Sequence, residues 1–250
     1  GKRILEAGAG TGVLQWWLAD RGAEIVSADR LDRRELSFRF RARYRVRGLR
    51  PEDYTGPAAM VRLRLLGSQN DLGSRLAGGG RAAVGAVAEA LLPKRSGKVW
   101  LYNTDLARLG ALEAATFDAV VSVSALEHNA PAEIGVIVDE LMRVLTPGGV
   151  LLATVAAARD QDWYHEPSRG WCLTEASMLS AFRMPPDSGS NFDQFDDLFA
   201  RLRACSVLRS TLPAWYSRSG DNGMPWGVWD PKYLPVGVLR CKPSGFAGLD

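Results

Sequence analysis

The chain has 250 residues, of which 46% are hydrophobic and 24% charged, and a formal net charge of +3. These values are ordinary for a globular protein, and the length suits one α/β domain or a domain with a large insertion. No apolar run approaches the roughly 20 residues that a membrane helix needs, which predicts no transmembrane segment. Three scattered cysteines and two histidines argue against a disulfide framework or a histidine-based metal site, so we expect a cytoplasmic protein without a metal.

The first elements form a predicted β-α-β unit. An apolar run at residues 4–8 that ends in glycine is typical of a buried strand. Residues 11–21 show the apolar spacing of a helix, and residues 24–29 form a second strand. Because the first strand begins almost at residue 1, we expect the sequence to be truncated at its N-terminus.

Residues 33–97 are far longer than the roughly 2–6 residues that usually join a strand to a helix, and they predict an insertion. This segment contains thirteen arginines, one lysine and five acidic residues, so its net charge is +9 and that of the rest of the chain is −6. We expect this insertion to be dispensable for the core fold, because lengthening a loop costs little entropy.

Arginine and apolar residues alternate over residues 39–47, which predicts a strand with every arginine on one face, and residues 61–65 repeat the pattern briefly. Three consecutive glycines at 78–80 indicate a flexible break. The alanine-rich residues 81–92 predict a helix.

Regular alternation of strands and helices resumes after the insertion. Strands are predicted at residues 98–102, 117–125, 150–156, 205–212 and 235–241. One helix is predicted to begin at Pro131, with an apolar stripe of Ile134, Ile137, Val138, Leu141 and Leu145. A second helix is predicted over residues 174–183, with Thr174 as its N-cap. Such alternation predicts an α/β fold, a mostly parallel sheet flanked by helices, with a basic insertion between strands 2 and 3.

The turn after the first strand, Glu6 to Gly12, reads EAGAGTG. Glycines let the backbone turn sharply and approach a ligand without Cβ clashes, at the position where doubly wound sheets bind nucleotides. The dinucleotide fingerprint requires a further glycine where this chain has Val13. Asp29 closes the second strand at the offset expected of an acid that accepts hydrogen bonds from ribose hydroxyls.

The fourth strand is followed by Leu126-Glu127-His128, and residues 141–151 read LMRVLTPGGVL. With the glycine-rich turn, these segments resemble the class I S-adenosylmethionine-dependent methyltransferases, in particular the type 11 group. The resemblance covers residues 1–32 and 98–157 and implies a Rossmann-like fold in a single methyltransferase domain over 1–250. The chain departs from the family in the insertion 33–97 and in lacking the usual N-terminal helical lid.

The resemblance implies that the cofactor is S-adenosylmethionine. In that family the glycine loop lies beside the methionyl part of the cofactor, and an acid at the position of Glu6 suits the positive charge of the cofactor. Asp105 matches the acid that accepts the adenine amino group, although Thr104-Asp105-Leu106 alone would more often begin a helix. The expected cofactor contacts are Glu6, Gly8, Ala9, Gly10, Gly12, Asp29, Asp105, Leu106 and Ser124.

His128 is the candidate catalytic base, because histidine has an ordinary pKa near 6.5 and can accept a proton at neutral pH. The alternative is a positioning residue that hydrogen-bonds to the backbone. His165, on the loop after the fifth strand, is a weaker second candidate.

We expect O- or N-methylation of a small molecule or a sugar. Aromatic residues gather among glycines and prolines in residues 213–235, where they suit a polar ring compound or, equally, cover the sheet edge. A nucleic acid is the less favoured acceptor: the basic insertion fits an RNA methyltransferase, but a solvated arginine face is the simpler interpretation. A cofactor-binding protein without catalysis is a further alternative, and Glu6 and Val13 disfavour a nicotinamide oxidoreductase.

Overall fold

The computed structural model describes residues 1–66, 72–95, 97–184, 190–211 and 229–244. The chain forms two compact units. Unit 1 comprises Gly1–Leu109 and Phe117–Ala119, and unit 2 comprises the other described residues. Strand β5 contributes to both. Among the described residues, none of the helices combines the length and apolar character that crossing a membrane requires.

Unit 1 is built on four parallel strands in the order β3-β4-β2-β1. Its elements in chain order are β1 (Arg3–Ala7), α1 (Leu14–Asp20), β2 (Glu24–Asp29), α2 (Phe38–Arg43), β3 (Arg45–Gly48), the 3-10 turn η1 (Pro51–Asp53), α3 (Pro57–Leu66), α4 (Leu72–Leu91) and β4 (Lys98–Asn103). In the strand register, Ala7 of β1 stands beside Ala28, and Asp29 of β2 stands beside Asn103. The carboxyl ends of β1, β2 and β4 therefore share one edge.

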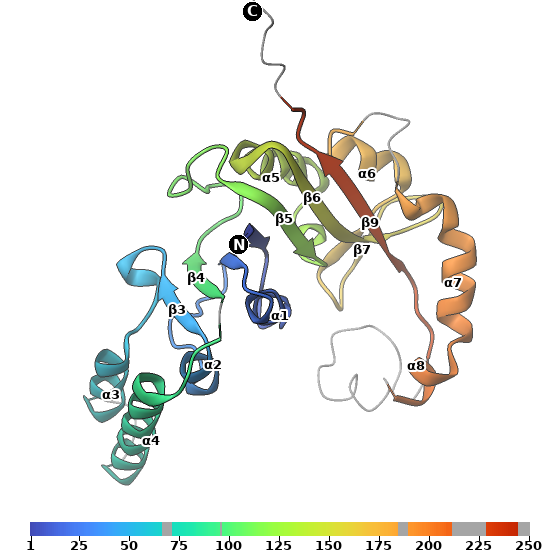
Figure 1. Ribbon diagram of the computed structural model, residues 1–250. Coiled ribbons are helices and arrows are strands. Elements are labelled where there is room, and N and C mark those ends of the chain that lie inside the picture. Colours follow the sequence, from blue (N-terminus) through green and yellow to red (C-terminus); the bar gives the residue numbers. More distant parts are fainter. Residues whose placement is uncertain (67–71, 96, 185–189, 212–228, 245–250) are drawn as a thin grey trace, which may run out of the picture. The chain divides into compact units, whose positions relative to one another are not determined.

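Unit 2 carries the strand order β5-β6-β9, with β9 antiparallel to β6 (Figure 1). Its elements are β5 (Phe117–Val123), η2 (Leu126–His128), α5 (Pro131–Val144), β6 (Leu145–Ala157), β7 (Trp163–His165), β8 (Gly170–Cys172), α6 (Glu175–Ala181), η3 (Asn191–Gln194), α7 (Phe195–Ala204), α8 (Ser206–Thr211) and β9 (Leu234–Cys241). The expected apolar stripe of α5 is buried from Ile134 to Leu145, and Thr174 accepts the capping hydrogen bond of Ser177 N–H. The expected α/β architecture with a mostly parallel sheet is confirmed.

The expectation of a strand over residues 39–47 is wrong at its start, because α2 occupies Phe38–Arg43. The rings of Phe40 and Tyr44, one helical turn apart, both pack on Trp16, with centroids 4.6 and 4.9 Å away. Arg41 is buried and ion-pairs with Glu89 at 2.9 Å. Tertiary packing thus selects the helical period over the alternating one; alternating burial survives only over residues 43–47.

The glycines at 78–80 do not break the chain, because they lie inside α4. Gly79 and Gly85 of this helix permit close packing instead: a Cβ on Gly79 would clash with Leu65 of α3, and one on Gly85 would stand 2.8 Å from Cβ of Phe38. Figure 1 shows α3 and α4 side by side. Residues 61–65, expected to repeat the alternating pattern, belong to helix α3.

The segment between β2 and β4 supplies part of the core of unit 1. Tyr44 and Val46 are buried in one cluster with Ile25, Val99 and Leu101, and β3 pairs with β4. This packing argues against the expectation that residues 33–97 are dispensable for the fold, and we expect instead that the fold needs them. The strand expected at 205–212 is also wrong, because Ser206–Thr211 forms helix α8 and residue 212 lies outside the described residues.

Candidate functional site

The glycine loop after β1 is anchored to the end of β2. The backbone N–H groups of Gly8 and Ala9 donate to the carbonyl oxygen of Ala28, at 2.9 and 3.3 Å. Gly8 and Gly10 have φ angles of 79° and 50°, in the left-handed region that favours glycine. A Cβ on Gly10 would meet no atom within 4 Å, so the loop borders open space in which a ligand could lie against the backbone.

Asp29 joins this loop to the residues that follow β2. Its Oδ2 accepts a 2.7 Å hydrogen bond from Gly10 N–H, and its Oδ1 accepts a 2.6 Å bond from Leu31 N–H. The carboxylate is half-buried, and each oxygen has capacity to accept a further hydrogen bond. A vicinal diol, which offers two neighbouring hydroxyl donors, fits this arrangement.

Asp105, after β4, reaches the same edge because Thr104 N–H donates to the carbonyl oxygen of Asp29 at 2.8 Å. Its carboxylate accepts Ala107 N–H at 3.0 Å and ion-pairs with Arg30 at 2.6 Å. These two contacts hold the pKa of Asp105 below its ordinary value. Leu106 is buried. The Asp105 carboxylate thus already binds Ala107 N–H and Arg30, and a ligand donor would have to bind beside these two partners or replace one of them.

Glu6 is buried at the end of β1, where Ser27 Oγ lies 3.2 Å from its carboxylate. Burial raises the pKa of Glu6 to about 7, against smaller opposing effects of Ser27 and Arg33. A cation bound near this buried carboxyl group would stabilise its charged form.

Arg33 is a member of this group that the sequence did not single out. Its guanidinium is buried and donates to Ser27 Oγ at 2.8 Å and to the Ser27 carbonyl oxygen at 2.6 Å. It supplies positive charge beside Glu6 and Asp29. Nothing in the sequence distinguishes it from the other arginines of the basic segment, because only the packing buries it.

A cavity of about 390 Å³ lies in unit 1 beside the glycine loop. Among the expected cofactor contacts, Gly10 and Gly12 line it, together with Leu31, Trp16 and Phe40. Asp29, Asp105 and Leu106 do not line this cavity, although the backbone contacts bring Asp29 and Asp105 to the same edge.

In unit 2, Ser124 directly follows strand β5 and has a φ of 48°, an uncommon angle for a residue other than glycine. Its N–H donates to both the carbonyl oxygen and Oγ1 of Thr154, at 3.0 and 3.1 Å. This turn leads directly into η2, which holds Leu126, Glu127 and His128. Strained backbone of this kind is frequently found at functional sites.

His128 is exposed, and its Nδ1 lies 2.9 Å from the carbonyl oxygen of Arg169. Because a carbonyl oxygen only accepts, Nδ1 must carry the proton. In the neutral ring the lone pair is then on Nε2, which can accept a proton. The contact fits both sequence interpretations, since it positions the ring and prepares Nε2 as a base.

Glu127, the middle residue of η2, is 5% exposed, and its Oε2 has no hydrogen-bond partner among the described residues. Burial raises the pKa of its carboxyl group. Burial also raises the pKa of the Cys172 thiol to about 12, and Glu127 adds to that effect. The buried, unpaired oxygen of Glu127 was not predicted, because the sequence does not show which face of η2 is covered.

His165, the second candidate base, lies on β7 and is buried rather than open to solvent. Its Nδ1 lies 2.7 Å from Ser168 Oγ, and its ring packs edge-on against Trp163 and Tyr233, with centroids 5.5 and 5.2 Å away. Burial lowers its pKa. Most of the aromatic segment 213–235 lies outside the described residues; of the part described, Tyr233 joins this cluster.

Residues 82–153 match the family model described as a methyltransferase domain. The match runs from the second half of α4 into β6 and includes β5, η2 and α5. Over these residues it confirms the resemblance to methyltransferases that the sequence motifs indicated. No curated protein matches the chain. Among the described residues, no three histidine, cysteine, aspartate or glutamate side chains are grouped to hold a metal ion.

The solved structures that are weakly similar to this chain include the following three. An S-adenosylmethionine-dependent methyltransferase from Methanosarcina mazei is 20% identical over 64% of this chain and 54% of its own, with a TM-score of 0.36. The [4+2]-cyclase SpnF is 17% identical over 98% and 76%, with a TM-score of 0.48. A phosphoethanolamine N-methyltransferase from Haemonchus contortus, bound to phosphomonomethylethanolamine and S-adenosylhomocysteine, is 13% identical over 97% and 49%, with a TM-score of 0.49. The chain thus spans about half the length of the first and third, and none of these similarities bears on its activity.

Proposed function

We propose that this chain, which carries a methyltransferase domain, transfers a methyl group from S-adenosylmethionine to a small-molecule or sugar acceptor. The observation that carries the proposal is the glycine loop held to Asp29 by the Gly10 N–H bond, at the shared edge of β1, β2 and β4. The domain organisation that we propose is a single methyltransferase domain with residues 33–97 as an added segment.

The cofactor is S-adenosylmethionine, and the residues of unit 1 fit it. The loop at Gly8, Ala9, Gly10 and Gly12 offers a backbone surface without clashing side chains. Asp29 is suited to the ribose hydroxyls, and the buried carboxyl of Glu6 is suited to a cationic ligand. Asp105 and Leu106 follow β4 as candidates for the adenine contact, and Ser124 is proposed as a further contact.

When bound, this cofactor supplies an activated methyl group on a sulfonium, which passes to a nucleophile with inversion while the C–S bonding electrons stay on sulfur. The protein aligns the two partners. A hydroxyl acceptor must also lose its proton, and the Nε2 atom of His128 is the proposed recipient. An amine that is already neutral needs no such base before the transfer.

The acceptor class is inferred from the basic segment as well. Of the arginines expected to form an exposed row, Arg41 is buried against Glu89. Arg33 is also buried, and Arg50 ion-pairs with Asp53. The charge that faces solvent is thus smaller than the sequence suggests, which favours a small acceptor over RNA. We also propose a cytoplasmic location, because the cysteines are sparse and unpaired among the described residues.

Turnover with single acceptors tests the proposal. The protein is incubated with S-adenosylmethionine and a phenol, a primary amine, a monosaccharide or a short RNA, and formation of S-adenosylhomocysteine is measured. We expect product with one of the small molecules. Product with RNA alone would support the RNA methyltransferase alternative, and cofactor binding without product from any class would support the non-catalytic one.

A further inference from the structure

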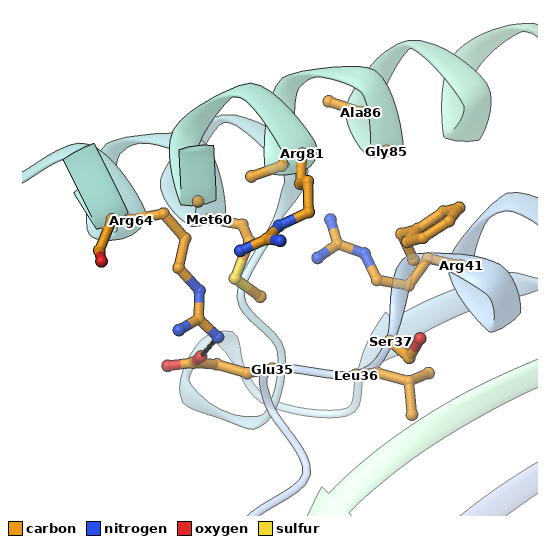
Figure 2. Close-up of a pocket in the computed structure, with 13 residues that line it drawn as sticks. Glu35, Leu36, Ser37, Arg41, Met60, Arg64, Arg81, Gly85 and Ala86 are labelled. Carbon is orange, nitrogen blue, oxygen red and sulfur yellow. Dashed lines mark hydrogen bonds and ion pairs between the residues drawn. The ribbon is translucent and has the colours of Figure 1, made fainter. Parts of the chain in front are cut away.

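A second cavity, of about 520 Å³, lies within the inserted segment of unit 1, between α3, α4 and the residues that lead into α2 (Figure 2). Its lining includes Arg41, Arg64 and Arg81. Figure 2 shows the guanidinium groups of Arg41 and Arg81 directed toward one another across the hollow, with Arg64 at one side. None of these three residues is assigned a role in cofactor binding or in methyl transfer.

The charges around this arginine cavity do not cancel. Arg41 is 4% exposed and ion-pairs with Glu89 at 2.9 Å, and Arg64 ion-pairs with Glu35 at 2.7 Å on the rim. Arg81 has no acidic partner among the described residues. One positive charge is therefore in excess, in a place where two further guanidinium groups already repel it.

A bound oxyanion would relieve this repulsion. Guanidinium groups present donors in a planar fork that matches phosphate and carboxylate oxygens, and such charge-assisted bonds are among the stronger hydrogen bonds in proteins. Arg41 is buried and held in place by Glu89, so it offers a pre-arranged part of the site rather than a mobile surface side chain.

The other walls are apolar or small, and include Leu36, Phe38, Met60, Ala82 and Ala86. Gly85 helps to keep the space open where α4 passes Phe38. The volume lies within the roughly 300–1,000 Å³ typical of small-molecule sites. The cavity thus combines an anion-binding end with a surface suited to an organic group.

We propose that the arginine cavity binds a small organic phosphate, with the phosphate on the guanidinium groups and an apolar portion against the remaining walls. The arginine cavity shares Glu35, Leu36 and Ser37 with the cavity beside the glycine loop, but its three arginines line only the arginine cavity, and the proposal does not depend on methyl transfer. Phenyl phosphate serves as the probe, because it joins one phosphate to one apolar ring.

Calorimetric titration of the whole protein, without S-adenosylmethionine, tests the proposal. We expect phenyl phosphate to bind more tightly than inorganic phosphate or benzoate. Arg81→Ala should weaken phenyl phosphate binding by roughly 10- to 100-fold, the range for losing a hydrogen bond to a charged group. Arg62→Ala removes an exposed arginine of α3 outside the cavity and should leave the affinity unchanged.

Circular dichroism verifies that both variants are folded, and Arg81→Lys, which keeps the charge, should retain part of the affinity. Equal affinity in the parent and Arg81→Ala, absence of binding, or preference for benzoate would overturn the proposal. A short RNA that binds more tightly than phenyl phosphate, and that loses affinity equally in Arg62→Ala and Arg81→Ala, would overturn it in favour of a diffuse nucleic-acid surface.

Discussion

Gly10 donates its backbone N–H to Oδ2 of Asp29 at 2.7 Å, which joins the loop after β1 to the end of β2. The Asp29 carboxylate thus helps to hold the glycine loop, together with the bonds from the Gly8 and Ala9 N–H groups to the Ala28 carbonyl oxygen, and each of its oxygens can accept a further hydrogen bond.

Replacing Asp29 with alanine should weaken binding of S-adenosylhomocysteine by about 1–3 kcal/mol, the scale of lost hydrogen bonds to a charged group. Calorimetry measures the affinity. The matched control is Asp139→Ala, which removes a surface carboxylate of α5 that pairs with Arg183. This variant should bind like the parent. Parent-like affinity in Asp29→Ala would refute the ribose assignment.

Glu6 should make the stability of the cofactor-free protein depend on pH. Because burial raises its pKa from 4.5 to about 7, the folded state holds more protons than the unfolded state between these values. Stability from this group is therefore present at low pH and is lost as pH rises from about 4.5 to 7. Glu6→Gln should remove this loss and stabilise the protein at pH 8 by roughly 3 kcal/mol.

Urea unfolding of the parent and Glu6→Gln at pH 5 and pH 8 gives this comparison. The amide replaces a carboxyl of nearly the same shape, and Arg33 can keep its two bonds to Ser27 in the variant. The same pH dependence in both proteins would show that Glu6 titrates at an ordinary pKa.

Deleting residues 34–96 and joining the ends with a short linker should abolish cooperative folding. The deletion removes Tyr44 and Val46 from the cluster around Ile25 and exposes the edge of β4 that β3 covers. Near-ultraviolet circular dichroism and thermal unfolding report the packing. A deletion variant that unfolds cooperatively and binds the cofactor would show that the segment is dispensable after all.

For a hydroxyl acceptor, His128→Ala should lower kcat by about 10²–10⁴-fold, the usual contribution of a general base, with cofactor affinity unchanged. His128→Asn separates the two roles, because its amide can replace the donor that faces the Arg169 carbonyl but cannot act as a base. Single-turnover rates of the three proteins give the answer. If His128→Asn is as fast as the parent, the histidine only positions the loop.

The main strands and α5 could be predicted because their apolar residues are buried, as are Leu151, Ala153 and Val155 in β6 and the stripe from Ile134 to Leu145. Helix α2 could not, since alternation and helical spacing coexist in residues 39–47 and only Trp16, distant in sequence, decides between them. Glycines 78–80 were predicted to break the chain because the sequence does not show the tertiary contact of Gly79 with Leu65 of α3.

That Gly10 and Asp29 lie together could be predicted from their spacing along the chain, because the strand ends of a parallel sheet meet at one edge. Arg33 and the unpaired oxygen of Glu127 did not follow. Each is an ordinary charged residue in the sequence and becomes notable only through burial, which depends on neighbours far along the chain.

Calorimetric titration of the protein with S-adenosylhomocysteine, and separately with NAD, tests the central claim most directly. We predict one molecule of S-adenosylhomocysteine bound per chain, with its affinity reduced in Asp29→Ala, and no binding of NAD. Binding of NAD in place of S-adenosylhomocysteine, or no binding of either by the folded protein, would contradict the assignment of the glycine loop to a methyl-transfer cofactor.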